Sequence, residues 1–146
     1  MPFSGNRLRV SGSLPVWLHQ VVDKLNAILA LKENWDSYGS LRIRPETAIA
    51  AIYVLDSVML EGTPIPSMVP TPSGNIQAEW HIFGIDLEVE ITSTGNYSIS
   101  YEDGTEQSEP YESDLPGQSL NSSSPLPDLL DRLTHRADME KQQALG

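Results

Sequence analysis

Two stretches of the chain repeat apolar residues at helical spacing. The first runs from about residue 14 to 33 and the second from about 45 to 61, each with polar residues on its other faces. An apolar stripe that recurs at steps of three and four residues is typical of a helix packed on a core. The pattern therefore predicts two amphipathic helices. The stripe of the first helix comprises Leu14, Trp17, Leu18, Val21, Leu25, Ile28 and Leu29.

Further along the chain, apolar and polar residues alternate. The runs "NIQAEWHI", "IDLEVEIT" and "NYSISYE" each place every second residue in the apolar class. Strict alternation is typical of strands with one buried and one solvated face. Turns are expected at Phe83-Gly84 and at "STGN", so these runs predict consecutive antiparallel strands. A short edge strand at 67–69, between prolines, is a candidate fourth strand.

These elements predict an α+β fold in which two amphipathic helices pack on one face of a three- or four-stranded antiparallel meander. We expect this domain to span residues 1–103. An acidic linker rich in Ser and Pro follows at 104–127, and a short C-terminal helix at 128–146 completes a flexible tail. Because an isolated short helix is marginal in water, we expect the helix to order only when it docks, either on its own domain or on a partner. We favour the partner and expect the truncated domain to fold without the helix. Its candidate anchors are Leu129, Leu130 and Leu133.

Charge is distributed unevenly along the chain. The net charge is -11, yet residues 1–44 carry more Lys and Arg than acids, and residues 45–127 contain no Lys or Arg at all. Direct binding of nucleic acid needs cationic side chains against the phosphates, so this distribution of charge argues against nucleic acid as a ligand. The same distribution favours a basic protein partner. The sequence has no cysteine and no apolar run near the roughly 20 residues of a membrane span, so we expect a cytoplasmic protein without membrane contact.

Four carboxylates fall in phase on the polar side of two predicted strands: Glu79, Asp86, Glu88 and Glu90. They have three interpretations: a solvated face, a partner-binding surface, or a site for a divalent cation in a hydrolase. We interpret them as partner-binding residues and expect no catalytic residue, no metal ligand and no cofactor. His81 is the one histidine near them in the sequence.

The segment "ENWDSYGS", residues 33–40, places two aromatic residues in a predicted loop. An aromatic side chain at the end of a helix most often closes the end of a core, so we interpret Trp35 as a structural clamp. A binding pocket lined by Trp35 and Tyr38 is the alternative.

Three motifs between about residues 31 and 103 carry a resemblance. They are "ENWD-x-YG" at 33–39, "PTP-x-G-x-IQ-x-EW" at 70–80 and "LEVEI" at 87–91. In these motifs the chain resembles a family of small, uncharacterised bacterial proteins. The resemblance covers about half of the chain and implies no chemistry for any of its residues.

The sequence thus predicts a non-enzymatic acidic interaction protein, antitoxin-like or inhibitor-like, that binds a basic protein partner. A metal-dependent hydrolase that uses the sheet carboxylates is one alternative. An acidic mimic of nucleic acid that inhibits a nucleic-acid enzyme is another. A homodimer formed through an exposed edge strand near Met68 or Tyr97 is also compatible with the pattern.

Overall fold

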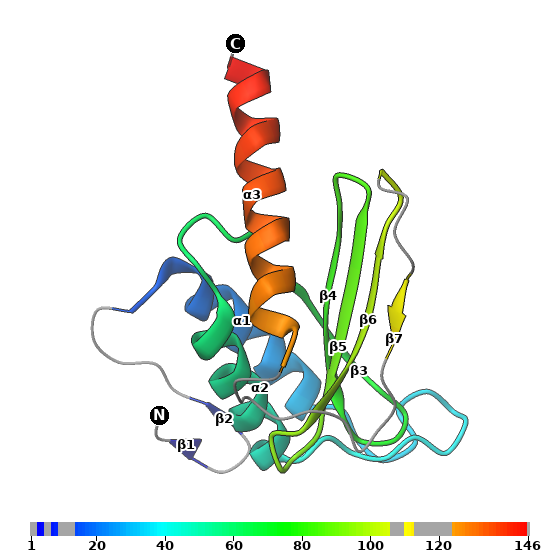
Figure 1. Cartoon of the computed structure of the whole chain (residues 1–146). Helices are drawn as coiled ribbons and strands as arrows, with labels where there is room; N and C mark the ends of the chain where they lie inside the picture. Colours follow the sequence, from blue (N-terminus) through cyan, green and yellow to red (C-terminus); the bar gives the residue numbers. More distant parts are fainter. Residues whose placement is uncertain (1–2, 5–6, 9–13, 106–109, 113–123, 146) are drawn as a thin grey trace.

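The computed structural model describes residues 3–4, 7–8, 14–105, 110–112 and 124–145. These residues form an α+β fold, which confirms the class expected from the sequence (Figure 1). The helices are α1 (Val16–Leu29), α2 (Pro45–Val58) and α3 (Leu126–Leu145). A two-stranded ladder near the N-terminus consists of β1 (Phe3–Ser4) and β2 (Arg7–Leu8). The main sheet consists of β3 (Ser67–Pro70), β4 (Ile76–Ile82), β5 (Ile85–Ile91), β6 (Tyr97–Asp103) and β7 (Tyr111–Glu112).

The main sheet has five strands within the described residues, rather than the expected three or four. Neighbouring strands follow one another along the chain, and every pair is antiparallel. The tight turn between β4 and β5 has positive φ at both Phe83 (50°) and Gly84 (83°). A two-residue hairpin turn of this kind matches the twist of the flanking strands, and glycine meets its backbone requirement at little cost. The turn therefore sets the register in which Ile82 pairs with Ile85.

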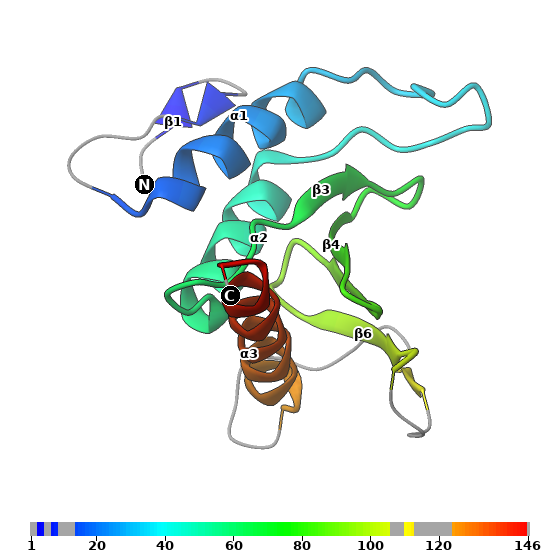
Figure 2. The same cartoon turned by 90° about the horizontal axis from the view of Figure 1, so that it is seen from above.

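The core lies between the helices and one face of the main sheet. Figure 2 shows α1 and α2 on the same side of the sheet, with α2 in contact with β4 and β5 and α1 in contact with β3. Alternate residues of the central strands point inward and are almost fully buried, which is the burial that the alternating pattern predicts. On the sheet they are Ile76, Ala78, Trp80, Ile85, Leu87, Val89, Ile91, Tyr97, Ile99 and Tyr101.

Helix α3 packs on the same core. Its apolar stripe, Leu126, Leu129, Leu130 and Leu133, is at most 7% exposed, and Thr134 Oγ1 forms a buried 2.7 Å hydrogen bond with Thr63 Oγ1. This corrects the expectation that Leu129, Leu130 and Leu133 are anchors for a partner. The physical reason is the hydrophobic effect: the apolar stripe of α3 packs against apolar surface of its own chain and is buried there. Only the C-terminal part of α3 extends beyond the body of the protein (Figure 1).

The predicted acidic linker contains ordered structure. Strand β7 pairs with β6, with Tyr111 opposite Tyr101, and it lies inside the segment that we expected to be linker. The linker residues 106–109 and 113–123 lie outside the described residues, so the expectation of a flexible chain is not tested there. Within the described part of the chain, none of the helices combines the length and apolar character required to cross a lipid bilayer.

Candidate functional site on the polar face of the sheet

The second face of the main sheet carries mostly charged and hydroxyl side chains. We call it the polar face, and it comprises Gln77, Glu79 and His81 on β4, Asp86, Glu88 and Glu90 on β5, Ser98, Ser100 and Glu102 on β6, and Glu112 on β7. The described helices α1 and α2 lie against the opposite face (Figure 2). All four carboxylates that the sequence singled out, Glu79, Asp86, Glu88 and Glu90, are therefore on one surface, and they come from two adjacent strands.

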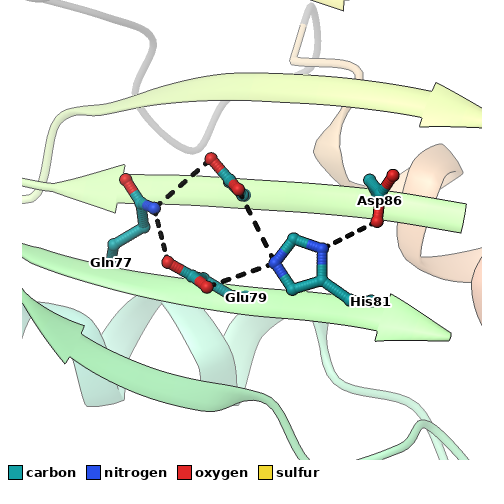
Figure 3. Close-up of polar contacts among 5 residues, drawn as sticks. Gln77, Glu79, His81 and Asp86 are labelled. Carbon is teal, nitrogen blue, oxygen red and sulfur yellow. Dashed lines mark hydrogen bonds and ion pairs between the residues drawn. The ribbon is translucent and has the colours of Figure 1, made fainter.

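His81 joins three of the carboxylates on this face (Figure 3). Its Nδ1 lies 2.7 Å from Asp86 Oδ1, its Nε2 lies 3.2 Å from Glu79 Oε1, and the same Nε2 lies 3.6 Å from Glu88 Oε1. The hydrogen bond with Asp86 is the main cause that raises the pKa of His81 above its ordinary value. Partial burial opposes this rise, and the bond with Glu79 adds to it. When it is protonated, the imidazole is a cation among these carboxylates.

Gln77 contacts Glu79 and Glu88 from the side opposite His81. Its Nε2 donates to Glu79 Oε2 at 2.6 Å and approaches Glu88 Oε2 at 3.4 Å (Figure 3). Glu79 and Glu88 are direct partners in the β4–β5 register, and like charges in such a pair destabilise a sheet. Gln77 and His81 reduce this repulsion from opposite sides. One ligand atom each from Glu79, His81 and Glu88 lies within 4.8 Å of the other two.

A shallow depression lies beside this cluster. Its volume is about 250 Å³, and its lining comprises Gln77, Glu88, Glu90, Ser98, Ile99, Ser100 and Glu112. Glu90 is positioned by Asn75, whose Nδ2 donates to Glu90 Oε2 at 2.9 Å. Among the described residues, the lining offers carboxylate and hydroxyl oxygens and one amide, and no cationic group. Its chemistry suits the charged end of a Lys or Arg side chain.

The loop that holds Trp35 and Tyr38 lies away from the polar cluster. Tyr38 is 91% exposed, and Trp35 is only partly buried, with its Nε1 donating to Leu41 O at 3.1 Å. Neither ring lies in the core, so the interpretation of Trp35 as a plug at the end of the core is wrong. Nor can a side chain as exposed as Tyr38 form the wall of an enclosed pocket. In Figure 2 the loop extends past β3, away from the helices.

Backbone hydrogen bonds explain the sequence of this loop. Asp36 Oδ1 accepts from the backbone N–H groups of Tyr38 (2.8 Å) and Ser40 (3.2 Å), and the bond from Tyr38 is the main cause that lowers the pKa of Asp36. Asn34 and Ser37 have positive φ values of 60° and 67°, and positive φ is uncommon for residues other than glycine. The hydrogen bonds of the "ENWDSYGS" segment therefore stabilise its own turn, and the segment does not close the end of the core.

Two features of the site escaped the sequence analysis. The contacts of Gln77 with Glu79 and Glu88 were not predicted, and neither were those of His81 with the carboxylates. The available signal was the period of two, because Gln77, Glu79 and His81 alternate on one strand and must share a face. Comparison of the chain with models of protein families, with curated proteins and with solved structures found no match.

Proposed function

We propose that the chain is a non-enzymatic interaction protein, antitoxin-like or inhibitor-like, whose polar face binds a basic surface of a partner protein. The observation that supports this most directly is the composition of the polar face. Within the described part of the chain, its ionisable side chains are six carboxylates and one histidine: Glu79, Asp86, Glu88, Glu90, Glu102, Glu112 and His81.

The negative charge on this face is only partly compensated. His81 contacts three carboxylates, but Glu90 and Glu102 have no ion pair with it. Asp86 and Glu102 are opposite each other in the β5–β6 register, which repeats the like-charge pairing of Glu79 and Glu88. A cationic surface placed against the sheet would relieve this repulsion, and complementary charge of this kind gives an interface its specificity and its rate of association.

The size of the depression favours a side chain over a small substrate. Sites for small molecules are usually clefts of about 300 to 1,000 Å³. The depression beside Glu88 and Glu90 has about 250 Å³, which is below that range. Its polar lining has two carboxylates from β5 and two hydroxyl groups from β6, Ser98 and Ser100. We therefore assign it to a Lys or Arg side chain of the partner.

An arginine-rich peptide is a direct probe of this assignment. Fluorescence anisotropy with labelled octaarginine, in buffer with EDTA, measures its affinity for the full chain. The double variant Glu88→Gln/Glu90→Gln should weaken binding by at least about tenfold, equivalent to roughly 1.4 kcal/mol. The matched control is Asp56→Asn/Glu61→Gln, which removes the same charge at exposed positions on and after α2.

The control should bind the peptide as the wild-type chain does. Equal weakening in both double variants would show that only net charge attracts the peptide, and the polar face would then have no special role. The Glu88→Gln/Glu90→Gln variant should be no less stable than the wild type, because the substitutions relieve repulsion. Thermal melting of both variants provides this check on folding.

A further inference from the structure

Three potential ligand atoms converge on the polar face from two strands. Glu79 and His81 are two residues apart on β4 and therefore point to the same side of the sheet. Glu88 is the direct partner of Glu79 on β5. Glu79 Oε1 and Glu88 Oε1 approach the same atom, His81 Nε2, at 3.2 and 3.6 Å (Figure 3). The sheet itself, rather than a mobile loop, sets these separations.

Two of the three separations are close to those around a tetrahedral metal ion. Zn²⁺ binds nitrogen and carboxylate oxygen at about 2.0–2.1 Å, so neighbouring ligand atoms in a tetrahedron are about 3.3–3.4 Å apart. The separations of 3.2 Å (His81 to Glu79) and 3.6 Å (His81 to Glu88) lie on either side of this value, and all three ligand atoms lie within 4.8 Å of one another. Adjustment of the two glutamate side chains would therefore bring all three atoms to binding distance of one ion.

The atoms that do not converge are held by neighbouring side chains. His81 Nδ1 bonds to Asp86 Oδ1 at 2.7 Å, which directs Nε2 at the two glutamates. The Oε2 atoms of Glu79 and Glu88 both face Gln77 Nε2, which leaves their Oε1 atoms facing His81. The second ring nitrogen of a metal-binding histidine almost always bonds to a carboxylate, a backbone carbonyl or water, and this bond fixes the orientation of the ring.

We propose that Glu79, His81 and Glu88 bind one divalent transition-metal ion of the Zn²⁺ type. The imidazole ligand is decisive for this choice, because Mg²⁺ and Ca²⁺ prefer oxygen ligands whereas imidazole suits Zn²⁺ and its neighbours. The side chains are 20%, 46% and 39% exposed, so an ion reaches them directly from solvent. Three protein ligands leave a coordination position open to water or to a donor group of another molecule. The site goes beyond the proposed binding of a basic partner and does not depend on it.

Titration with Zn²⁺ tests the proposal. The full chain without a polyhistidine tag is treated with a chelator, dialysed and titrated with ZnCl₂ in a calorimeter. We expect one ion per chain, and no heat of binding with MgCl₂ under the same conditions. His81→Ala and Glu79→Gln should abolish the binding of Zn²⁺, and Asp86→Asn should weaken it by about 10- to 100-fold because it removes the group that orients the ring.

Two control variants separate a defined site from general attraction. Glu90→Gln removes a charge from the same face outside the three ligands, and His135→Ala removes an exposed histidine on α3. Both should bind Zn²⁺ as the wild type does. The proposal is overturned if the wild type does not bind Zn²⁺, if binding survives His81→Ala, or if Glu90→Gln weakens it as much as Glu79→Gln.

Nuclear magnetic resonance gives a second readout that does not depend on the variants. Addition of Zn²⁺ should shift the ring resonances of His81 and leave those of His19 and His135 in place; shifts of all three rings alike would contradict the site. Circular dichroism of each variant verifies that it is folded. Because octaarginine binding is measured in EDTA, loss of the metal site and loss of the proposed partner-binding surface are distinguishable.

Discussion

Arg136 Nη2 lies 2.7 Å from Asp103 Oδ2, and this ion pair ties α3 to the end of β6. The Asp103 side chain is 1% exposed and that of Arg136 is 20% exposed. Thr105 donates to Asp103 Oδ1 from its backbone N–H (2.9 Å) and its hydroxyl (2.6 Å). A second guanidinium nitrogen, Arg136 Nη1, donates to Phe83 O at 2.9 Å. One arginine thus joins the helix to the sheet and to the β4–β5 turn.

Replacement of Arg136 by alanine should be strongly destabilising. It would leave the Asp103 carboxylate buried without its cation, and breaking a buried pair in this way costs about 3–5 kcal/mol. Urea denaturation measures the loss in the free energy of unfolding. Arg132→Ala is the control on an exposed position of the same helix, and a change there should stay within about 0.5 kcal/mol. Similar small losses in both variants would show that the ion pair does not hold α3.

The same ion pair predicts a dependence of stability on acid. Burial on its own would raise the pKa of Asp103, but hydrogen bonds from Arg136 and Thr105 outweigh it and hold the pKa below its usual value. A carboxyl with a lowered pKa in the folded state stabilises the fold above its unfolded pKa of about 3.9, and this contribution is lost as the pH falls through the folded pKa. The urea midpoint of the wild type should therefore fall between about pH 5 and pH 2, and fall less in Asp103→Asn. An equal fall in both proteins would contradict this assignment.

The leucines of α3 should behave as core residues. Leu130 and Leu133 are each 0% exposed, so Leu130→Ala and Leu133→Ala should each cost about 2–5 kcal/mol of unfolding free energy. Leu145, which is 86% exposed on the same helix, is the control and should cost less than about 0.5 kcal/mol. If Leu130→Ala is as stable as Leu145→Ala, α3 does not belong to the core, and the initial interpretation as a detachable partner-binding helix is favoured.

Two tryptophans should differ in their contribution to stability. Trp80 is 2% exposed and its Nε1 donates to Pro64 O at 2.7 Å, so Trp80→Ala should cost about 3–5 kcal/mol. Trp35 is partly exposed in the loop and makes one hydrogen bond to Leu41 O, so Trp35→Ala should cost about 0.5–1.5 kcal/mol. Chemical denaturation compares the two variants directly. A cost at Trp35 equal to that at Trp80 would restore the interpretation of Trp35 as a plug of the core.

The period of hydrophobic residues predicted much of this fold, because burial acts on every turn of a helix and every second residue of a strand. The stripe of α1 includes Leu18, Val21, Leu25 and Ile28, which are all buried, and the alternation in β5 matches its burial residue by residue. The α+β class and the grouping of Glu79 with Glu88 followed from the same period. Periodicity shows which face of each helix or strand is buried, but it does not show which elements pack against one another.

What the sequence did not predict depends on contacts between distant segments. Leu130 has the same pattern whether its helix docks on a partner or on its own chain, and only the available core surface decides. Asp103 and Arg136 are 33 residues apart, so no local pattern indicates their ion pair. The position of Trp35 depends on the hydrogen bonds that Asp36 accepts, because they stabilise a tight turn within the loop. His81 was in phase with Glu79, but the distances that join them require the register of β4 and β5.

Mapping of amide resonances with unlabelled octaarginine identifies the surface of the chain that binds a cationic partner. In the full ¹⁵N-labelled chain, in EDTA, we expect the largest shifts at alternate positions of β4, β5 and β6 around Glu79, Glu88 and Ser100. The exposed carboxylates of α2 and α3 should show little change, although they too attract a cation. Shifts spread evenly over all exposed acidic residues, or concentrated on the helices, would contradict binding of a basic partner by the polar face.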